Sequence, residues 1–208
     1  MLGHQGLLLL LWSRLAFAGS LGARAKNAPT GPFGLYAYGS GIGGAPVIYS
    51  QGKSNSVESR RHEWTNLTQK YQDVAFIGDL AEMDNLDAAR VVFTQGSDNS
   101  LLGSPDMASA RGSPSWSNKA FFVPSSTASS HRVGFTNTTS STDTSTSGFI
   151  FYGPTALHQG SADTLQSLWY VVPTQFRRVW ALEWNATDDR SEDKVSITLR
   201  SIPPSRAF

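Results

Sequence analysis

The sequence predicts an all-β protein with a single domain, built as an antiparallel β-sandwich, with a closed or jelly-roll-like β-barrel as the alternative. Short runs rich in aromatic and β-branched residues recur along the chain, separated by clusters of Gly, Pro, Ser and Asn. No long stretch shows the 3.6-residue periodicity of an amphipathic helix. The 208 residues include no cysteine, so packing and hydrogen bonds between strands must hold the core.

The expected strands follow these runs along the whole chain. In order, they are residues 33–38, 47–50, 74–77, 90–94, 120–123, 132–135, 148–152, 168–172, 179–184 and 195–201. Residues 195–201 carry the clearest pattern, because apolar and polar side chains alternate strictly and so mark one buried and one wet face. Short helical turns are expected only around residues 81–88 and 162–166.

The first 18 residues are expected to be a signal peptide. An apolar run over residues 7–12 is too short to span a bilayer, and Ala16-Phe17-Ala18 has the small-x-small pattern of a cleavage site. A second such pattern allows cleavage as late as residue 25. The β domain then occupies residues 29–203, and no other segment could span a membrane. We therefore expect a secreted, extracellular protein, and the cell wall is one expected location.

Two asparagines are predicted glycosylation sites, Asn137 and Asn185, because each begins an Asn-x-Ser/Thr sequon. Asn185 has further support from the strand before it. Alternation there places Trp180, Leu182 and Trp184 on one face and Glu183 with Asn185 on the other, which is expected to face water.

Residues 54–72 do not resemble their surroundings, because charge is dense there and the strand pattern stops. When they are left out, residues 49–53 join residues 73–79 as strand, Gly turn and strand, which predicts a hairpin. The segment is either a genuine surface insertion or a retained intron translated in frame. Its sequon at Asn66 and its His and Trp residues are therefore given no functional weight.

Composition and charge exclude several classes of function. A formal net charge of +1 offers no electrostatic basis for binding nucleic acid or an anionic membrane. Without cysteine there is no thiol chemistry and no zinc site of the cysteine type. No cofactor is predicted, and nothing indicates the oligomeric state.

Three patterns suggest chemistry but are better explained otherwise. Residues 39–44 match G-x-G-x-x-G, yet a second strand rather than a helix follows, which favours a Gly-rich loop over a dinucleotide site. Acidic residues at 79–87 and 188–193 have no EF-hand spacing and are interpreted as solvated loops. His131 and His158 are isolated, and none of the acids is singled out as a catalytic pair.

Aromatic residues are the remaining candidates for a binding surface. In a fold without disulfides most of them are expected in the core, where they contribute the largest apolar area. Tyr36 and Tyr38 share one strand face, opposite Phe33 and Leu35, and are predicted to be the exposed pair that contacts carbohydrate.

Several segments together resemble small secreted proteins of filamentous ascomycete fungi, hypothetical or cell-wall-like and of unassigned function. They are residues 33–39, 42–46, 76–79, 148–153, 168–170 and 179–185. The resemblance covers most of the mature chain in order, implies no catalytic residues, and leaves out residues 54–72. It implies an extracellular or wall-associated protein.

The absence of catalytic motifs and the weakly charged surface favour a non-catalytic protein that contacts cell-wall polysaccharide. Two alternatives stay open. One is a glycan-active hydrolase with an unrecognised carboxylate pair, which would need an open cleft between the two acids. The other is a secreted effector-type interaction protein.

Overall fold

The computed structural model describes residues 29–51, 73–137, 141–160, 164–185 and 187–205. These residues form an all-β domain of fourteen strands, as predicted, and contain no α-helix. Two short 3-10 turns are present, η2 (Leu80–Glu82) and η3 (Ser97–Asn99). No helix in the described part of the chain is long and apolar enough to cross a membrane.

Six antiparallel strands close into a barrel. Around it run β1 (Tyr36–Gly39), β2 (Ile42–Tyr49), β3 (Ala75–Gly78), β13 (Val179–Trp184), β12 (Trp169–Pro173) and β14 (Val195–Arg200). Closure depends on β1, which pairs with β2 on one side and with β14 on the other. The closed barrel is the architecture that the sequence predicts as the alternative to a sandwich.

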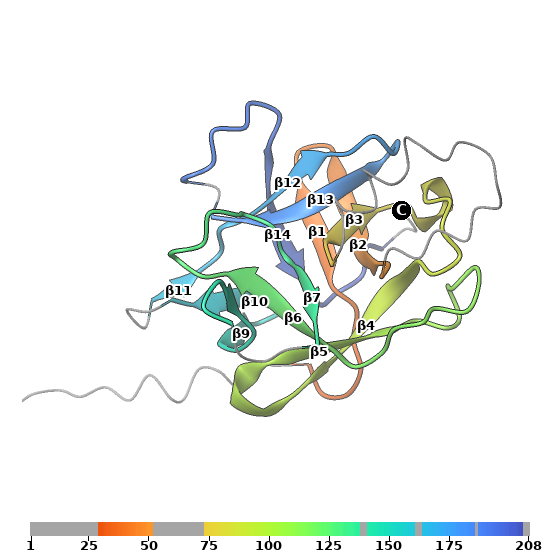
Figure 1. Ribbon diagram of the computed structural model, residues 1–208, viewed down its shortest axis with the longest axis horizontal. Helices are drawn as coiled ribbons and strands as arrows, with labels where there is room; N and C mark the ends of the chain where they lie inside the picture. Colours follow the sequence, from red (N-terminus) through yellow and green to blue (C-terminus); the bar gives the residue numbers. More distant parts are fainter. Residues whose placement is uncertain (1–28, 52–72, 138–140, 161–163, 186, 206–208) are drawn as a thin grey trace, which may run out of the picture.

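Two further groups of strands attach to the barrel. A sheet joins it through β2 and contains β4 (Ala89–Gln95), β5 (Leu101–Pro105), β6 (Lys119–Pro124), β7 (Gly134–Thr136) and β8 (Thr144–Ser145). The other group joins it through β14 and contains β9 (Phe149–Tyr152), β10 (Thr155–Gln159) and β11 (Leu165–Gln166). Figure 1 shows the first sheet below the barrel strands and the second group at the left.

One aromatic-rich core fills the barrel and continues under the attached sheets. At its centre the rings of Trp169 and Trp184 meet edge to face, with centroids 4.5 Å apart. The Trp169 Nε1–H donates a hydrogen bond to the Ala156 carbonyl at 3.0 Å, so the indole is buried without an unpaired donor. The prediction that most aromatic residues belong to the core is confirmed for Trp116, Trp169, Trp184 and Tyr170.

A second, smaller apolar cluster lies on the outside of the barrel. Its buried members are Ile48, Val74, Phe76, Leu80, Met83, Ala88, Val179 and Ala181. Val179 and Ala181 of β13 belong to this outer cluster, whereas Trp180 and Leu182, on the opposite face, pack in the core of the barrel. The first half of β13 is therefore covered on both faces. On the outer face of β13, this cluster leaves only the second half of the strand uncovered.

The predicted hairpin on either side of residues 54–72 is present. β2 pairs antiparallel with β3 up to Tyr49↔Ala75. The Tyr49 hydroxyl donates to Asp73 Oδ1 at 3.0 Å, and burial first, with the Asp73 charge second, raises the pKa of Tyr49. The choice between insertion and intron stays open, because residues 54–72 lie outside the described residues, as do the expected signal peptide and Asn66.

Several local predictions need correction. Strands β5, β8, β10 and β11 were not predicted from the sequence. β8 and β11 have two residues each, and β5 carries Gly and Pro. The expected helical turn at 162–166 is wrong for its described end, because Leu165–Gln166 pairs with β10 as a strand. The Gly-rich loop is confirmed at Gly41, whose φ of 72° suits glycine in the tight β1–β2 turn.

Candidate functional site

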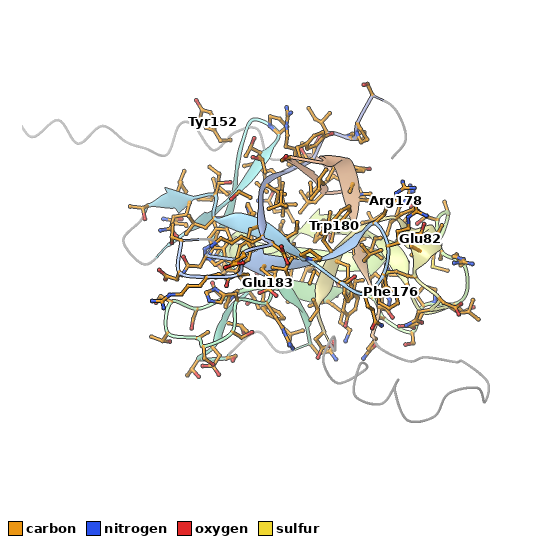
Figure 2. The ribbon with its side chains drawn as sticks, turned by 90° about the horizontal axis from the view of Figure 1, so that it is seen from above. Glu82, Tyr152, Phe176, Arg178, Trp180 and Glu183 are labelled. Carbon is orange, nitrogen blue, oxygen red and sulfur yellow. The ribbon has the colours of Figure 1, made fainter. Side chains whose placement is uncertain are left out.

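An open cleft of about 550 Å³ lies on the outer face of β12 and β13, beyond the second apolar cluster. Its lining is mostly polar and charged: Ser130, His131, Arg132, Tyr170, Val172, Pro173, Glu183, Asp189, Ser191, Glu192 and Asp193. Figure 2 shows Glu183 well separated from Tyr152 and from Arg178 and Glu82.

Strand register builds the floor of this cleft. Arg132 lies opposite Glu183, Glu183 opposite Tyr170, and Tyr170 opposite Ser196. Residues directly opposite each other on paired strands project to the same face. Three of these four side chains therefore meet in one row that opens into the cleft.

The segment that carries His131 and Arg132 is fixed along the edge of β13 by backbone hydrogen bonds. The Trp184 N–H donates to the His131 carbonyl at 2.8 Å, and the Val133 N–H donates to the Leu182 carbonyl at 3.1 Å. The His131 ring also contacts the Trp184 carbonyl through Nδ1 at 3.0 Å. Because a carbonyl only accepts, Nδ1 carries the proton and Nε2 is the nitrogen that remains for a ligand.

Glu183 is the unusual group of the cleft. Burial raises the pKa of its carboxyl to about 7, although the charges of Arg132 and His131 act to lower it and that of Asp189 acts to raise it. Among the described residues no group donates a hydrogen bond to this carboxylate. Glu183 therefore holds a proton at mildly acidic pH and offers it to the cleft.

Asp189, in the loop between β13 and β14, has the opposite protonation state. Burial by itself raises its pKa, but the Tyr170 hydroxyl and two hydrogen bonds from Ser191 outweigh burial and lower the pKa to about 2. The Ser191 N–H and hydroxyl reach Asp189 Oδ1 at 3.0 and 2.8 Å. The pKa values of Glu183 and Asp189 are thus shifted in opposite directions within a cleft that Glu192 and Asp193 also line.

Tyr170 lies between these groups and is fully buried. Its hydroxyl is near enough to Asp189 for each to shift the pKa of the other, yet no hydrogen bond of normal geometry joins them. Burial is the main reason that the pKa of Tyr170 is raised. Lys194 lies 5.8 Å from the ring centroid and donates to the Asp189 carbonyl, so it ties the loop to the floor.

The described residues contain no group of three or more His, Asp or Glu side chains placed to hold a metal ion. His158, the other histidine considered from sequence, is buried in the core. Its Nε2 is 3.1 Å from the Ser147 carbonyl, and burial lowers its pKa. It packs against Phe149 and Trp184, which assigns it a structural role.

The predicted carbohydrate contacts, Tyr36 and Tyr38, lie on β1 and do not line the cleft. Both are half-buried rather than fully exposed. The Tyr38 hydroxyl donates to the Ile202 carbonyl at 3.0 Å, and the Arg200 guanidinium lies 5.4 Å from its ring centroid. Their role in binding carbohydrate stays a prediction.

The predicted glycosylation sites differ in their surroundings. Asn137 is exposed at the end of β7. Asn185 is half-buried, and its Nδ2 donates to Asp188 Oδ2 at 2.6 Å, while the Thr187 hydroxyl donates to its Oδ1 at 2.9 Å. Glycosylation at both sites stays a prediction.

Sequence reasoning missed the residues of the cleft. Alternation placed Glu183 on a wet face, whereas it is half-buried. The interpretation of 188–193 as a solvated loop is correct for Asp188, Glu192 and Asp193, which are exposed, but Asp189 is half-buried. A carboxylate flanked by Leu182 and Trp184 in a long apolar strand is the signal that could have found it. The acidic stretch 79–87 needs the same correction at Asp87, which is buried and structural.

Comparison with family models, with curated proteins and with solved structures finds no match to this chain. The resemblance to secreted ascomycete proteins and the effector interpretation therefore stay predictions.

Proposed function

We propose that this protein is a secreted, extracellular or wall-associated glycan-binding protein whose ligand occupies the cleft over Glu183. Binding of a polyhydroxylated ligand needs hydrogen-bond donors and acceptors that converge in a concave site. Arg132 supplies donors, and the carboxylates of Asp189 and Glu192 supply acceptors. The observation that carries the proposal is Glu183 itself, a half-buried carboxyl group without a hydrogen-bond partner in the described chain.

Binding is tested by calorimetric titration with soluble oligosaccharides of chitin and of β-glucan, followed by pull-down on the insoluble polymers and on whole walls. We expect Arg132→Ala to weaken binding about tenfold, because it removes a charged donor from the cleft wall. Arg90→Ala, an equally exposed arginine on β4, is the matched control and should bind as the unchanged protein does. If no glycan binds in any format, the proposal is wrong.

Hydrolysis of the bound glycan is a second candidate function, and the opposite protonation of Glu183 and Asp189 favours it. Pairs of carboxyl groups whose environments separate their pKa values are typical of acid–base catalysis. Glu183 would donate its proton to the glycosidic oxygen as the bond to the anomeric carbon breaks. Asp189 would take a proton from the water that attacks this carbon, so one water is consumed for each bond cleaved.

The release of reducing ends from the bound glycan tests this second function. We expect kcat/KM to fall as the pH rises above about 7, where Glu183 loses its proton. Glu183→Gln should abolish turnover while the glycan still binds, because the amide keeps the shape of the neutral acid. A Glu183→Gln variant with full activity would show that Glu183 is not the catalytic acid. No turnover of any glycan that binds would leave binding as the only function.

A further inference from the structure

A second cavity of about 340 Å³ lies directly beside the cleft. The two share Ser130 and Arg132 in their walls. Arg132 is exposed, and its guanidinium has five donors that can serve ligand groups on both sides. The cleft and the second cavity therefore adjoin at Arg132.

The wall between the cavities is held in place on both sides. Arg132 pairs with Glu183 in the barrel, and Val74, in the wall of the second cavity, pairs with Gly134 of β7. Gly134 is required there, because a Cβ at this position would lie 1.8 Å from the Asp73 carbonyl oxygen. The Phe135 N–H donates to that oxygen at 2.9 Å. The relative position of the two cavities is thus set by paired strands.

The second cavity differs in chemistry from the first. Phe122, Pro124 and Ala128 give it apolar surface, and Thr127 and Ser129 add hydroxyl groups. Asp73 and Asp143 also line it. Sites for small polar molecules combine an apolar wall with a few hydrogen-bonding groups in this way. A sugar ring, with apolar faces and hydroxyl edges, matches such a lining.

We propose that the cleft and the second cavity form one groove that crosses Arg132 and binds a linear oligosaccharide of several units. This inference rests on the proposed glycan-binding function and specifies its ligand as a chain rather than a single sugar. Each cavity alone lies within the range of about 300–1,000 Å³ that holds a small ligand, so the two together are larger than one sugar requires.

The test is a calorimetric titration with a length series, from disaccharide to hexasaccharide, of the glycan that binds best. We expect the hexasaccharide to bind at least about tenfold more tightly than the disaccharide. Ala128→Trp fills the second cavity and should remove this gain while the disaccharide affinity stays within about twofold. Ala108→Trp, at an exposed turn position that lines neither cavity, is the matched control. Ser129→Trp, also at an exposed position, is a second blocking variant should Ala128→Trp fail to fold.

The outcomes separate the two proposals. Equal affinity for short and long oligosaccharides, or a length dependence that survives both blocking variants, overturns the extended groove and leaves the cleft as the site. Failure of every oligosaccharide to bind overturns the proposed function and the groove with it.

Discussion

Asp87 and Glu183 are two carboxylates withdrawn from water, and the fold treats them in opposite ways. Asp87 is 4% exposed and accepts hydrogen bonds from the Gln51 N–H at 2.8 Å and the Ser115 N–H at 2.6 Å. Its own carbonyl accepts from the Trp116 indole at 2.9 Å. Asp87 therefore ties three separate segments together and, because it is buried, is out of reach of a ligand.

Glu183 has charged neighbours but no donor among the described residues, and it faces a cleft. A buried carboxylate with donors is stabilised as an anion, whereas one without donors keeps its proton. Burial alone therefore does not identify a functional acid. The satisfied carboxylate holds the structure together, and the unsatisfied one is left for a partner.

The largest effect is expected at the satisfied carboxylate. Asp87→Ala should lower the free energy of unfolding by about 3 kcal/mol, because the part-buried N–H groups of Gln51 and Ser115 lose their acceptor. Urea denaturation at neutral pH measures the change. Asp84→Ala, at an exposed position three residues away, should change it by less than about 0.5 kcal/mol. Equal losses in both variants would show that Asp87 is not the anchor described above.

The effect at Glu183 should have the opposite sign. Its folded-state pKa, about 7, is above its ordinary value of 4.5, so ionisation destabilises the fold as the pH rises from about 4.5 to 7. Glu183→Gln should therefore be about 2 kcal/mol more stable than the unchanged protein at pH 8. The two should be equal at pH 4, where the carboxyl group is protonated in both states.

Unfolding curves across pH 4–8 test this difference, and Glu192→Gln, at an exposed position of the same cleft, is the matched control. A gain that is constant with pH would contradict the raised pKa of Glu183.

A smaller change is expected when the cation beside Glu183 is removed. Arg132→Gln should raise the pKa of Glu183 further, because the Arg132 charge holds it down. NMR titration of the Glu183 carboxyl carbon measures this directly. Arg90→Gln, on the attached sheet, should leave the titration unchanged. An unshifted titration in the Arg132 variant would place the guanidinium farther from the carboxyl than the structure does.

The smallest change is expected from the ionised partner. Asp189→Asn should lower the pKa of Glu183, because it removes a negative charge that raises this pKa. The change should be small, because Asp189 contributes less to the pKa than burial and Arg132 do. The same titration measures it, and the free energy of unfolding should move by less than about 1 kcal/mol. A rise in the pKa would argue against Asp189 facing Glu183 across the cleft.

The fold class follows from local features of the sequence. Alternation in residues 195–201 and the recurring aromatic and β-branched runs were enough to predict an all-β domain. The hairpin between Tyr49 and Ala75 was predicted because removing residues 54–72 brought two complementary runs together. Aromatic residues such as Trp169 were assigned to the core because they contribute the largest apolar area to a fold without disulfides.

The closure of the barrel and the composition of the cleft were decided only in three dimensions. β1 pairs with β14 as well as with β2. Because the pairing with β14 joins residues far apart in the sequence, no local pattern encodes it. The row of Arg132, Glu183 and Tyr170 likewise comes from three separate segments. Sequence alternation gave Glu183 its face of the strand, but the packed neighbours on that face, which remove water and raise its pKa, exist only once the sheet has formed.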